Sequence, residues 1–296
     1  MTVPVLLVLA QSTPTTDGSA PSPATFVEAD LAAPQVSVLD LGVTRGDGIF
    51  ESIGVVDGRA QALEPHLNRL AKSAGMLDLP APDLDLWRAG VLRSIELAGD
   101  SAAASELLVK LVLTRGIEGG DDVTGWVLCF ADVSHVDARE GISVVTLDRG
   151  YRSDVAETSP WLLQGAKTLS YALNKAALRE AERRGADDVV FVSTDGFVLE
   201  GPNSTVIALI DGEYVTTPSS LGVLEGTTQA AFFSDVEARG GRASYRPITV
   251  DELRAADALW LASSGRQIAP VVSLDGVPVA QDPAFTAAAE ERMLAR

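Results

Sequence analysis

The chain has 296 residues and a mass of 31.0 kDa, which is enough for two domains that each bury a core of their own. Hydrophobic residues make up 46% of it, and 41 acidic against 23 basic side chains give a formal net charge of −18. This composition indicates a globular protein. It argues against a nucleic-acid partner, because the phosphate backbone must be neutralised by Lys and Arg.

The N-terminal apolar run Val3–Ala10 predicts a strand. It is too short to span a bilayer and lacks the basic flank of a signal peptide, so we expect a cytoplasmic protein without a membrane partner. Residues 11–34 are rich in Ser, Thr, Pro, Ala and Gly and predict a loop or insertion after that strand.

The next segments predict a small two-layer α/β domain over residues 1–147. Asp57-Gly58 joins two alternating runs and indicates a hairpin. The expected elements are strands at 49–56, 60–63, 106–114 and 125–131 and helices at 65–75 and 84–98. The irregular, polar residues 148–160 predict an interdomain loop, and residues 161–296 predict a larger domain.

Few side chains suit metal binding or nucleophilic catalysis. Cys129 lies in an apolar run and is expected to be a buried structural thiol, and no Cys/His cluster offers metal ligands. Only His66 and His135 are present, which weakens a Ser-His or Cys-His hydrolase hypothesis.

Lys167 is a candidate cofactor residue, because lysine is scarce in this chain and this one follows the largely uncharged residues 159–166. A lysine can condense with the aldehyde of pyridoxal 5′-phosphate (PLP), and a carboxylate against the pyridine nitrogen keeps that ring protonated. Glu200 is the candidate for the second role. Taken alone, either residue would be interpreted as a solvated surface charge.

The sequence between these two residues predicts where Glu200 lies. Residues 176–184 predict a helix that Gly185 ends, and residues 188–193 predict a strand. Thr194-Asp195-Gly196 predicts a turn to a partner strand at 197–199. Glu200 then falls at a strand end, where Gly201 lets the backbone pass close to a ligand.

Thr227 and Thr228 precede a predicted helix at 229–238. Free amides and the helix dipole at such an N-terminus bind phosphate. The alternative is that one of these threonines only caps the helix.

These motifs, together with Arg45-Gly46-Asp47-Gly48-Ile49-Phe50-Glu51 and His66-Leu67-Asn68-Arg69-Leu70, resemble the class IV aminotransferases, the fold-type IV PLP enzymes. The match runs in the family's order from about Val38 to Val272. The resemblance implies the fold-type IV architecture, with a small α/β domain and a larger pseudo-barrel domain. It also implies a PLP cofactor and a homodimer.

The resemblance implies a role for each matching residue. Lys167 would be the Schiff-base lysine and the proton carrier, and Glu200 the partner of the pyridinium. Arg69 would grip the phosphate, although a surface arginine on an amphipathic helix is the alternative. The cofactor-binding set implied in full is Arg69, Lys167, Tyr171, Glu200, Ser204, Gly226, Thr227, Thr228 and Ser264.

The substrate site is less defined by the sequence. Thr114-Arg115-Gly116 resembles the lyase and D-amino acid branches, but Gly120 stands where those branches often carry an arginine for a substrate carboxylate. Gly54 likewise stands where the branched-chain enzymes carry an arginine. The remaining candidates for substrate contacts are Phe50, Glu51, Arg115, Arg152 and Arg266, and each arginine has a surface or structural role as its alternative.

The expected reaction is amino transfer between an amino acid, D-amino acids included, and a 2-oxo acid. Glu51 favours transamination, whereas Pro160 and Gly165 favour 4-amino-4-deoxychorismate lyase, which yields pyruvate and 4-aminobenzoate for folate biosynthesis. Two other classes stay open: a non-catalytic PLP-binding protein, and an oxidoreductase, although no Gly-x-Gly-x-x-Gly lies between a strand and a helix. The sequence leaves the donor and its stereochemistry undefined.

Overall fold

The computed structural model describes residues 4–11, 23–99, 106–131 and 136–295. They form two compact units. The first contains the described residues between Met1 and Asp132 together with Ala166–Ser170. The second contains those of Val133–Gly165 and Tyr171–Arg296. Both units combine helices with a sheet, as expected for a mixed α/β fold.

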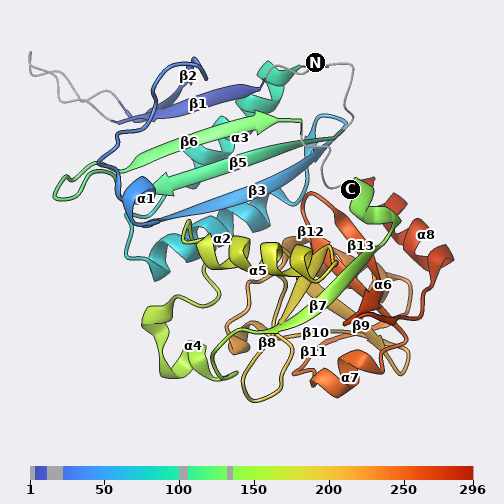
Figure 1. Cartoon of the computed structure of the whole chain (residues 1–296). Helices are drawn as coiled ribbons and strands as arrows, with labels where there is room; N and C mark the ends of the chain where they lie inside the picture. Colours follow the sequence, from blue (N-terminus) through green and yellow to red (C-terminus); the bar gives the residue numbers. More distant parts are fainter. Residues whose placement is uncertain (1–3, 12–22, 100–105, 132–135, 296) are drawn as a thin grey trace, which may run out of the picture. The chain divides into compact units, whose positions relative to one another are not determined.

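The first unit is a six-stranded antiparallel sheet with strand order β2-β1-β6-β5-β3-β4 (Figure 1). Helix α2 packs against β3, and α3 packs against β6 and β1. The elements are β1 (Val5–Ala10), β2 (Thr25–Ala29), α1 (Leu41–Thr44), β3 (Gly48–Val56), β4 (Arg59–Ala60), α2 (Leu63–Met76), α3 (Leu84–Ala98), β5 (Glu106–Thr114) and β6 (Thr124–Phe130).

Local sequence accounts for these elements. Asp83 caps α3 by accepting bonds from the amides of its first turn. Asp57 and Gly58 both have positive φ, as a two-residue hairpin turn requires, and they join β3 to β4. Along β3, Ile49 and Ile53 are fully buried, and strand alternation places Glu51, between them, on the same face of the sheet.

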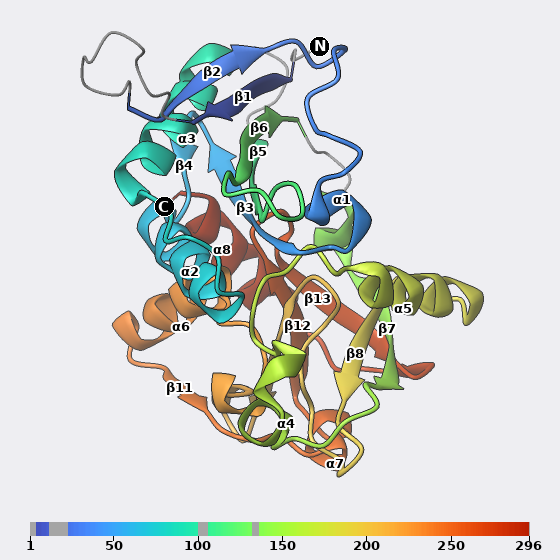
Figure 2. The same ribbon diagram turned by 90° about the vertical axis from the view of Figure 1, so that its left-hand side faces the viewer.

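The second unit is built on an eight-stranded curled sheet, with path β11-β10-β9-β12-β13-β7-β8 and β14 beside β13. The pairs β10–β11, β13–β7 and β7–β8 are parallel, and Figure 2 shows α5 close to β7 and β8. Its elements are η1 (Asp137–Glu140), β7 (Ile142–Asp148), α4 (Val155–Thr158), η2 (Pro160–Leu162), α5 (Ala172–Arg183), β8 (Asp188–Val192), β9 (Thr205–Ile210), β10 (Glu213–Thr216), η3 (Ser219–Leu221), α6 (Thr227–Ala238), β11 (Arg242–Tyr245), α7 (Val250–Arg254), β12 (Ala258–Ser263), β13 (Gln267–Leu274), β14 (Val277–Pro278) and α8 (Pro283–Leu294).

Apolar side chains from both faces of this sheet form the core of the second unit. On one side, α6 and α8 bury Phe232, Phe233 and Met293 against Trp260 of β12. Trp260 also donates a 3.0 Å hydrogen bond from its indole to Thr286, which satisfies its polar atom inside the core. The central strands β9, β12 and β13 are therefore fixed from the side that α6 and α8 cover.

Several expected boundaries differ from the structure. The loop expected at 11–34 contains β2, an edge strand that pairs with β1 and is largely exposed, so its sequence shows little apolar periodicity. Residues 142–147, included in the expected domain 1–147, belong to β7, which pairs with β13 and β8 of the second unit. The segment 148–160 contains the short helix α4, and 197–199 makes only isolated bridges.

The predicted bounds of two elements, the end of one helix and the burial of Cys129 agree with the structure. Helix α3 and strand β5 have the expected bounds, and α5 ends before Gly185, whose φ is +73°. Cys129 is fully buried, and burial raises the pKa of its thiol to about 11. Within the described residues, no helix is both long and apolar enough to cross a bilayer, and no group of His, Cys, Asp and Glu is arranged to hold a metal ion.

Candidate active site

The backbone of Lys167 lies along the open edge of β3. β4 pairs only with the last two residues of β3, so the other end of that edge has room for another strand. Here the amide of Phe50 donates to the carbonyl of Lys167 at 3.0 Å, and Leu169 donates to Gly48 at 2.8 Å. The Lys167 amide donates to Ser73 Oγ of α2 at 3.1 Å. Both peptide groups of Lys167 are thus fixed within the first unit.

The Lys167 side chain lies against an aromatic ring. Its Nζ is 4.4 Å from the centroid of Phe50, and Nζ of Lys110 is 5.3 Å from the same centroid. Lys110 pairs in register with Ser52, so strand alternation places its side chain on the same face as Phe50. Lys110 was not among the residues expected at the site, and it is the register of β5 against β3 that brings it to this ring.

Glu51 lies on the opposite face of β3 and is fully buried. Its carboxylate accepts two bonds from Arg69, from Nε and from Nη2, both 2.7 Å long. Nδ1 of His66 lies 2.7 Å from Glu51 Oε2. Glu51 therefore orients Arg69 from the helix-covered side of the sheet, and it does not point toward the side of Phe50 where we expected both residues to meet a substrate.

The charge states in this cluster follow from burial and pairing. Burial raises the pKa of Glu51, but the Arg69 guanidinium and its hydrogen bonds outweigh burial and bring the pKa to about 2. Burial lowers the pKa of His66, and the Glu51 carboxylate only partly opposes this. At neutral pH the cluster therefore contains a carboxylate, a guanidinium and a neutral imidazole, whose Nδ1–H donates to Glu51.

In the second unit, Glu200 follows the segment that bridges to β8. Its carbonyl accepts a 2.9 Å bond from Phe191, and its Oε2 accepts a 3.0 Å bond from the amide of Leu224. These bonds tie Glu200 to β8 on one side and to the residues before α6 on the other. The carboxylate is half-buried.

Ser204 lies in the turn that follows Glu200, and Tyr171, which precedes α5, bonds to the same turn. The Tyr171 hydroxyl donates to the carbonyl of Pro202 at 2.9 Å. Ser204 is 8% exposed, and its Oγ has no hydrogen-bond partner among the described residues. A side chain at Gly201 would come within 2.3 Å of that Oγ, so glycine is required there. An orphaned buried hydroxyl of this kind is a typical ligand contact.

The N-terminus of α6 has no side-chain cap. Gly226 is the N-cap, so Thr227 and Thr228 occupy the first turn, and the interpretation of either as a cap is wrong. A Cβ at Gly226 would meet Thr205 Oγ1 at 2.3 Å, which excludes larger residues. The amides of the first turn therefore point toward the end of the helix, where a phosphate binds favourably.

Ser264 lies in the turn between β12 and β13. The side chains that hold this turn were not expected from the sequence. Arg139 is 6% exposed and donates to the carbonyls of Gly265 and Arg266 at 3.0 and 3.1 Å. Gln267 ends the turn with φ +56° and donates to the carbonyl of Ser264 at 3.1 Å. The turn is therefore fixed by side chains, which keeps the position of Ser264 defined.

The three arginines considered for a substrate carboxylate all contact acidic residues. Arg115 forms a fork with Asp47, and Arg266 is buried and bonds to the buried Asp188. Arg152 is 65% exposed and lies near two aspartates, Asp154 and Asp195. The structure thus favours the structural interpretation of Arg115 and Arg266 and a surface position for Arg152.

Three comparisons with known proteins indicate the same family. The family model for class IV amino-transferases matches residues 48–274. A bifunctional aminodeoxychorismate lyase / D-amino acid transaminase of Mycobacterium tuberculosis is 45% identical over 253 residues, which cover 80% of this chain and 85% of that protein. A solved fold IV transaminase from Curtobacterium pusillum is 54% identical, with a TM-score of 0.93, and the match covers 99% of this chain and 100% of the other.

A second solved structure is an aminotransferase of M. tuberculosis that is described as hypothetical. Its PLP-bound form is 41% identical, has a TM-score of 0.86 and matches over 91% of this chain and 95% of the other. Its form with α-ketoglutarate and PMP is 40% identical, has a TM-score of 0.86 and matches over 98% and 97%.

Proposed function

Because the chain belongs to the class IV aminotransferases, which are PLP-dependent enzymes, we propose that it transfers the amino group of a D-amino acid to 2-oxoglutarate. The choice of donor is supported by the 45% identical relative that carries D-amino acid transaminase activity in its name. The acceptor is supported by the α-ketoglutarate-bound structure of the 40% identical aminotransferase.

One observation supports most strongly the assignment of Lys167 as the residue that carries the proton. Its peptide groups are hydrogen-bonded to β3 and to Ser73, while its ammonium lies against the Phe50 ring. A lysine held by its main chain keeps a mobile side chain on a fixed base. Such a side chain can carry a proton between the substrate Cα and C4′ of the cofactor without moving the backbone.

The donor set of each unit fits PLP. Ser204 has an orphaned hydroxyl, α6 has an uncapped N-terminus, and Arg69 is a buried cation. We assign the phosphate to Arg69, to the amides of Thr227 and Thr228 and to Ser264, because a phosphate favours a forked cation with neutral donors. Gly226, Ser204 and Tyr171 complete the proposed set.

We assign Glu200 to the pyridine nitrogen, where its carboxylate would keep the proton in place. The Leu224 amide and the backbone bond to Phe191 hold this carboxylate in one orientation. When bound, PLP supplies an aldehyde for a covalent link to an amine and a ring that accepts negative charge from Cα.

We assign the substrate carboxylate to Lys110. Its Nζ lies 5.3 Å from the centroid of the Phe50 ring, and Nζ of Lys167 lies 4.4 Å from the same centroid. Replacing Lys110 by Met should raise KM for the amino acid about tenfold and leave PLP retention unchanged, since one charge-assisted hydrogen bond is lost. An unchanged KM would remove Lys110 from the site.

A second activity is supported by the same relative, whose name includes aminodeoxychorismate lyase. It would release pyruvate and 4-aminobenzoate, a folate precursor. A single panel separates the candidates: D- and L-amino acids with 2-oxoglutarate or pyruvate, and aminodeoxychorismate alone. We expect turnover of D-amino acids; if no donor reacts and aminodeoxychorismate yields 4-aminobenzoate, the chain is a lyase. If no compound reacts with the PLP-loaded protein, the non-catalytic alternative holds.

We also propose a homodimer. The first unit exposes the apolar side chains of Val38 by 80%, Leu39 by 63% and Val43 by 62%, a cluster that a second copy can cover. Light scattering of the purified protein would test it, and a monomeric mass would contradict it. A cytoplasmic location remains a proposal that cell fractionation can test.

A further inference from the structure

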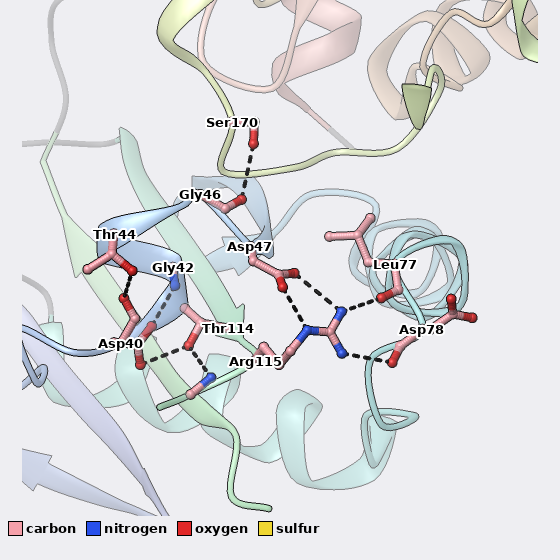
Figure 3. A network of polar contacts seen from close by, with 11 residues as sticks. Asp40, Gly42, Thr44, Gly46, Asp47, Leu77, Asp78, Thr114, Arg115 and Ser170 are labelled. Atoms are coloured by element: carbon pink, nitrogen blue, oxygen red, sulfur yellow. Dashed lines mark hydrogen bonds and ion pairs between the residues drawn. The ribbon is translucent and has the colours of Figure 1, made fainter. Parts of the chain in front are cut away.

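The guanidinium of Arg115 joins two segments of the first unit that are distant in sequence (Figure 3). On one side it grips Asp47, which precedes β3, with Nε to Oδ2 at 2.7 Å and Nη2 to Oδ1 at 3.3 Å. The Arg115 amide adds a 3.2 Å bond to the carbonyl of Asp47. The loop before β3 is thereby attached to the end of β5.

On its other side the same guanidinium holds the C-terminal end of α2. Nη2 donates to the carbonyl of Leu77 at 2.6 Å, and Nη1 donates to that of Asp78 at 3.2 Å. A cation at this end of a helix is favoured by the helix dipole and by carbonyls without intrahelical partners. All three nitrogens of the Arg115 guanidinium therefore donate to protein acceptors.

The two segments that Arg115 joins are also the two that hold the backbone around Lys167. The carbonyl of Gly46 in the loop accepts a 3.2 Å bond from Ser170 Oγ, and the carbonyl of Gly48, the first residue of β3, accepts a bond from the Leu169 amide. In the helix, Ser73 accepts the amide of Lys167. A change in the distance between loop and helix would therefore move both supports of Lys167.

We propose that Arg115 and Asp47 are positioning residues for Lys167, and that Arg115 does not bind the substrate. This inference rests on the proposed function, in which Lys167 is linked to PLP and carries the proton. The Arg115–Asp47 fork fixes the spacing between the start of β3 and α2. It thereby fixes the position from which Nζ of Lys167 reaches the Cα atom of the substrate. Hydrogen bonding to Asp47 also raises the pKa of Arg115, so its guanidinium stays charged throughout the working range.

Steady-state kinetics of the PLP-saturated Arg115→Lys and Asp47→Asn enzymes test this. We expect kcat to fall about tenfold in each, because a misplaced catalytic group lowers the rate of proton transfer, while KM for the amino acid changes by less than about twofold. The isotope effect with an α-deuterated amino acid should rise. The double variant should be no slower than the single ones, because both remove the same fork.

Arg88→Lys is the matched control. Arg88 also forks a carboxylate of the first unit, Glu64 at the start of α2, at 2.7 and 2.8 Å, and its side chain is similarly exposed, but it joins α2 to α3 and, within the described residues, has no bond to the loop before β3 or to the C-terminal end of α2. Its kinetics should match the wild type. If Arg115→Lys behaves like Arg88→Lys, the fork has only a structural role and the proposal fails.

The opposite change in the kinetic constants would also overturn the proposal. A raised KM with unchanged kcat in Arg115→Lys, together with a normal Asp47→Asn enzyme, would make Arg115 a substrate-binding residue. If Arg115→Lys does not fold, the near-isosteric Asp47→Asn variant decides alone. Borohydride labelling of the wild type on a lysine other than Lys167 would instead refute the proposed function, so the two failures are distinguishable.

Discussion

Two arginine–carboxylate forks in the first unit have similar geometry and different surroundings. Arg69 and Glu51 are 9% and 0% exposed, whereas Arg115 and Asp47 are 37% and 31% exposed. The shortest nitrogen–oxygen distance is 2.7 Å in both. Bond length therefore does not distinguish them. Burial decides whether a fork determines the stability of the fold or only the position of the segments that it joins.

The largest expected difference concerns stability. Glu51→Gln leaves the buried guanidinium of Arg69 without its charge partner and should lower the free energy of unfolding by about 3–5 kcal/mol. Asp47→Asn should lower it by less than about 1 kcal/mol, because water solvates what remains. Urea denaturation of both variants without PLP measures this, and equal losses would contradict the comparison.

The buried fork should also give a specific acid dependence. The pKa of Glu51 is 4.5 in the unfolded chain and about 2 in the fold, so its ionised form stabilises the fold fully above pH 4.5. That contribution is lost as the pH falls through 2. The stability difference between wild type and Glu51→Gln should therefore shrink as the pH falls from 4.5 toward 2, and a constant difference would show that the charge of Glu51 is not its cause.

Phosphate binding gives a smaller difference. Replacing Glu51 by Gln and Arg69 by Met together removes the buried pair without leaving either charge alone, and it should weaken PLP affinity about tenfold or more. Ser264→Ala should weaken it only mildly, because a neutral donor contributes less than a charged one. Equilibrium dialysis with PLP, and with pyridoxal as the control that has no phosphate, measures both. Equal losses for PLP and pyridoxal would contradict the phosphate assignment.

Salt should give the smallest difference. The Arg115–Asp47 coupling energy from a double-mutant cycle should fall by about 0.5 kcal/mol or less between 0.1 and 1 M NaCl, since exposed charges are screened. The coupling of Arg69 with Glu51 should stay unchanged. A salt response of equal size in both forks would show that burial does not separate them.

Much of the first unit was predictable from local sequence. The Asp83 cap and the apolar period of α3, and the two apolar runs of β5 on either side of Lys110, defined those elements. The pairing of residues 166–170 with the edge of β3 was not predictable, because it joins segments that lie more than one hundred residues apart. Edge strand β2 was missed for the related reason that an exposed strand shows little apolar alternation.

The sequence proposed the residues of the candidate site but did not give the directions of their side chains. Phe50 and Glu51 were both expected at the substrate, yet adjacent residues of a strand face opposite sides, and only Phe50 lies beside Lys167. Strand alternation alone indicates this. The contacts of Arg115 with Leu77 and Asp78, which follow α2, were not predictable, because backbone carbonyls at a helix end leave no pattern in sequence.

Reduction with borohydride followed by peptide mapping tests the central claim most directly. The purified protein should be yellow, and the pyridoxyl group should be found on Lys167. The Lys167→Ala variant should fold and lose turnover, because it lacks the amine that links PLP and carries the proton. A pyridoxyl group on Lys72, Lys110 or Lys175, or turnover by Lys167→Ala, would contradict the account.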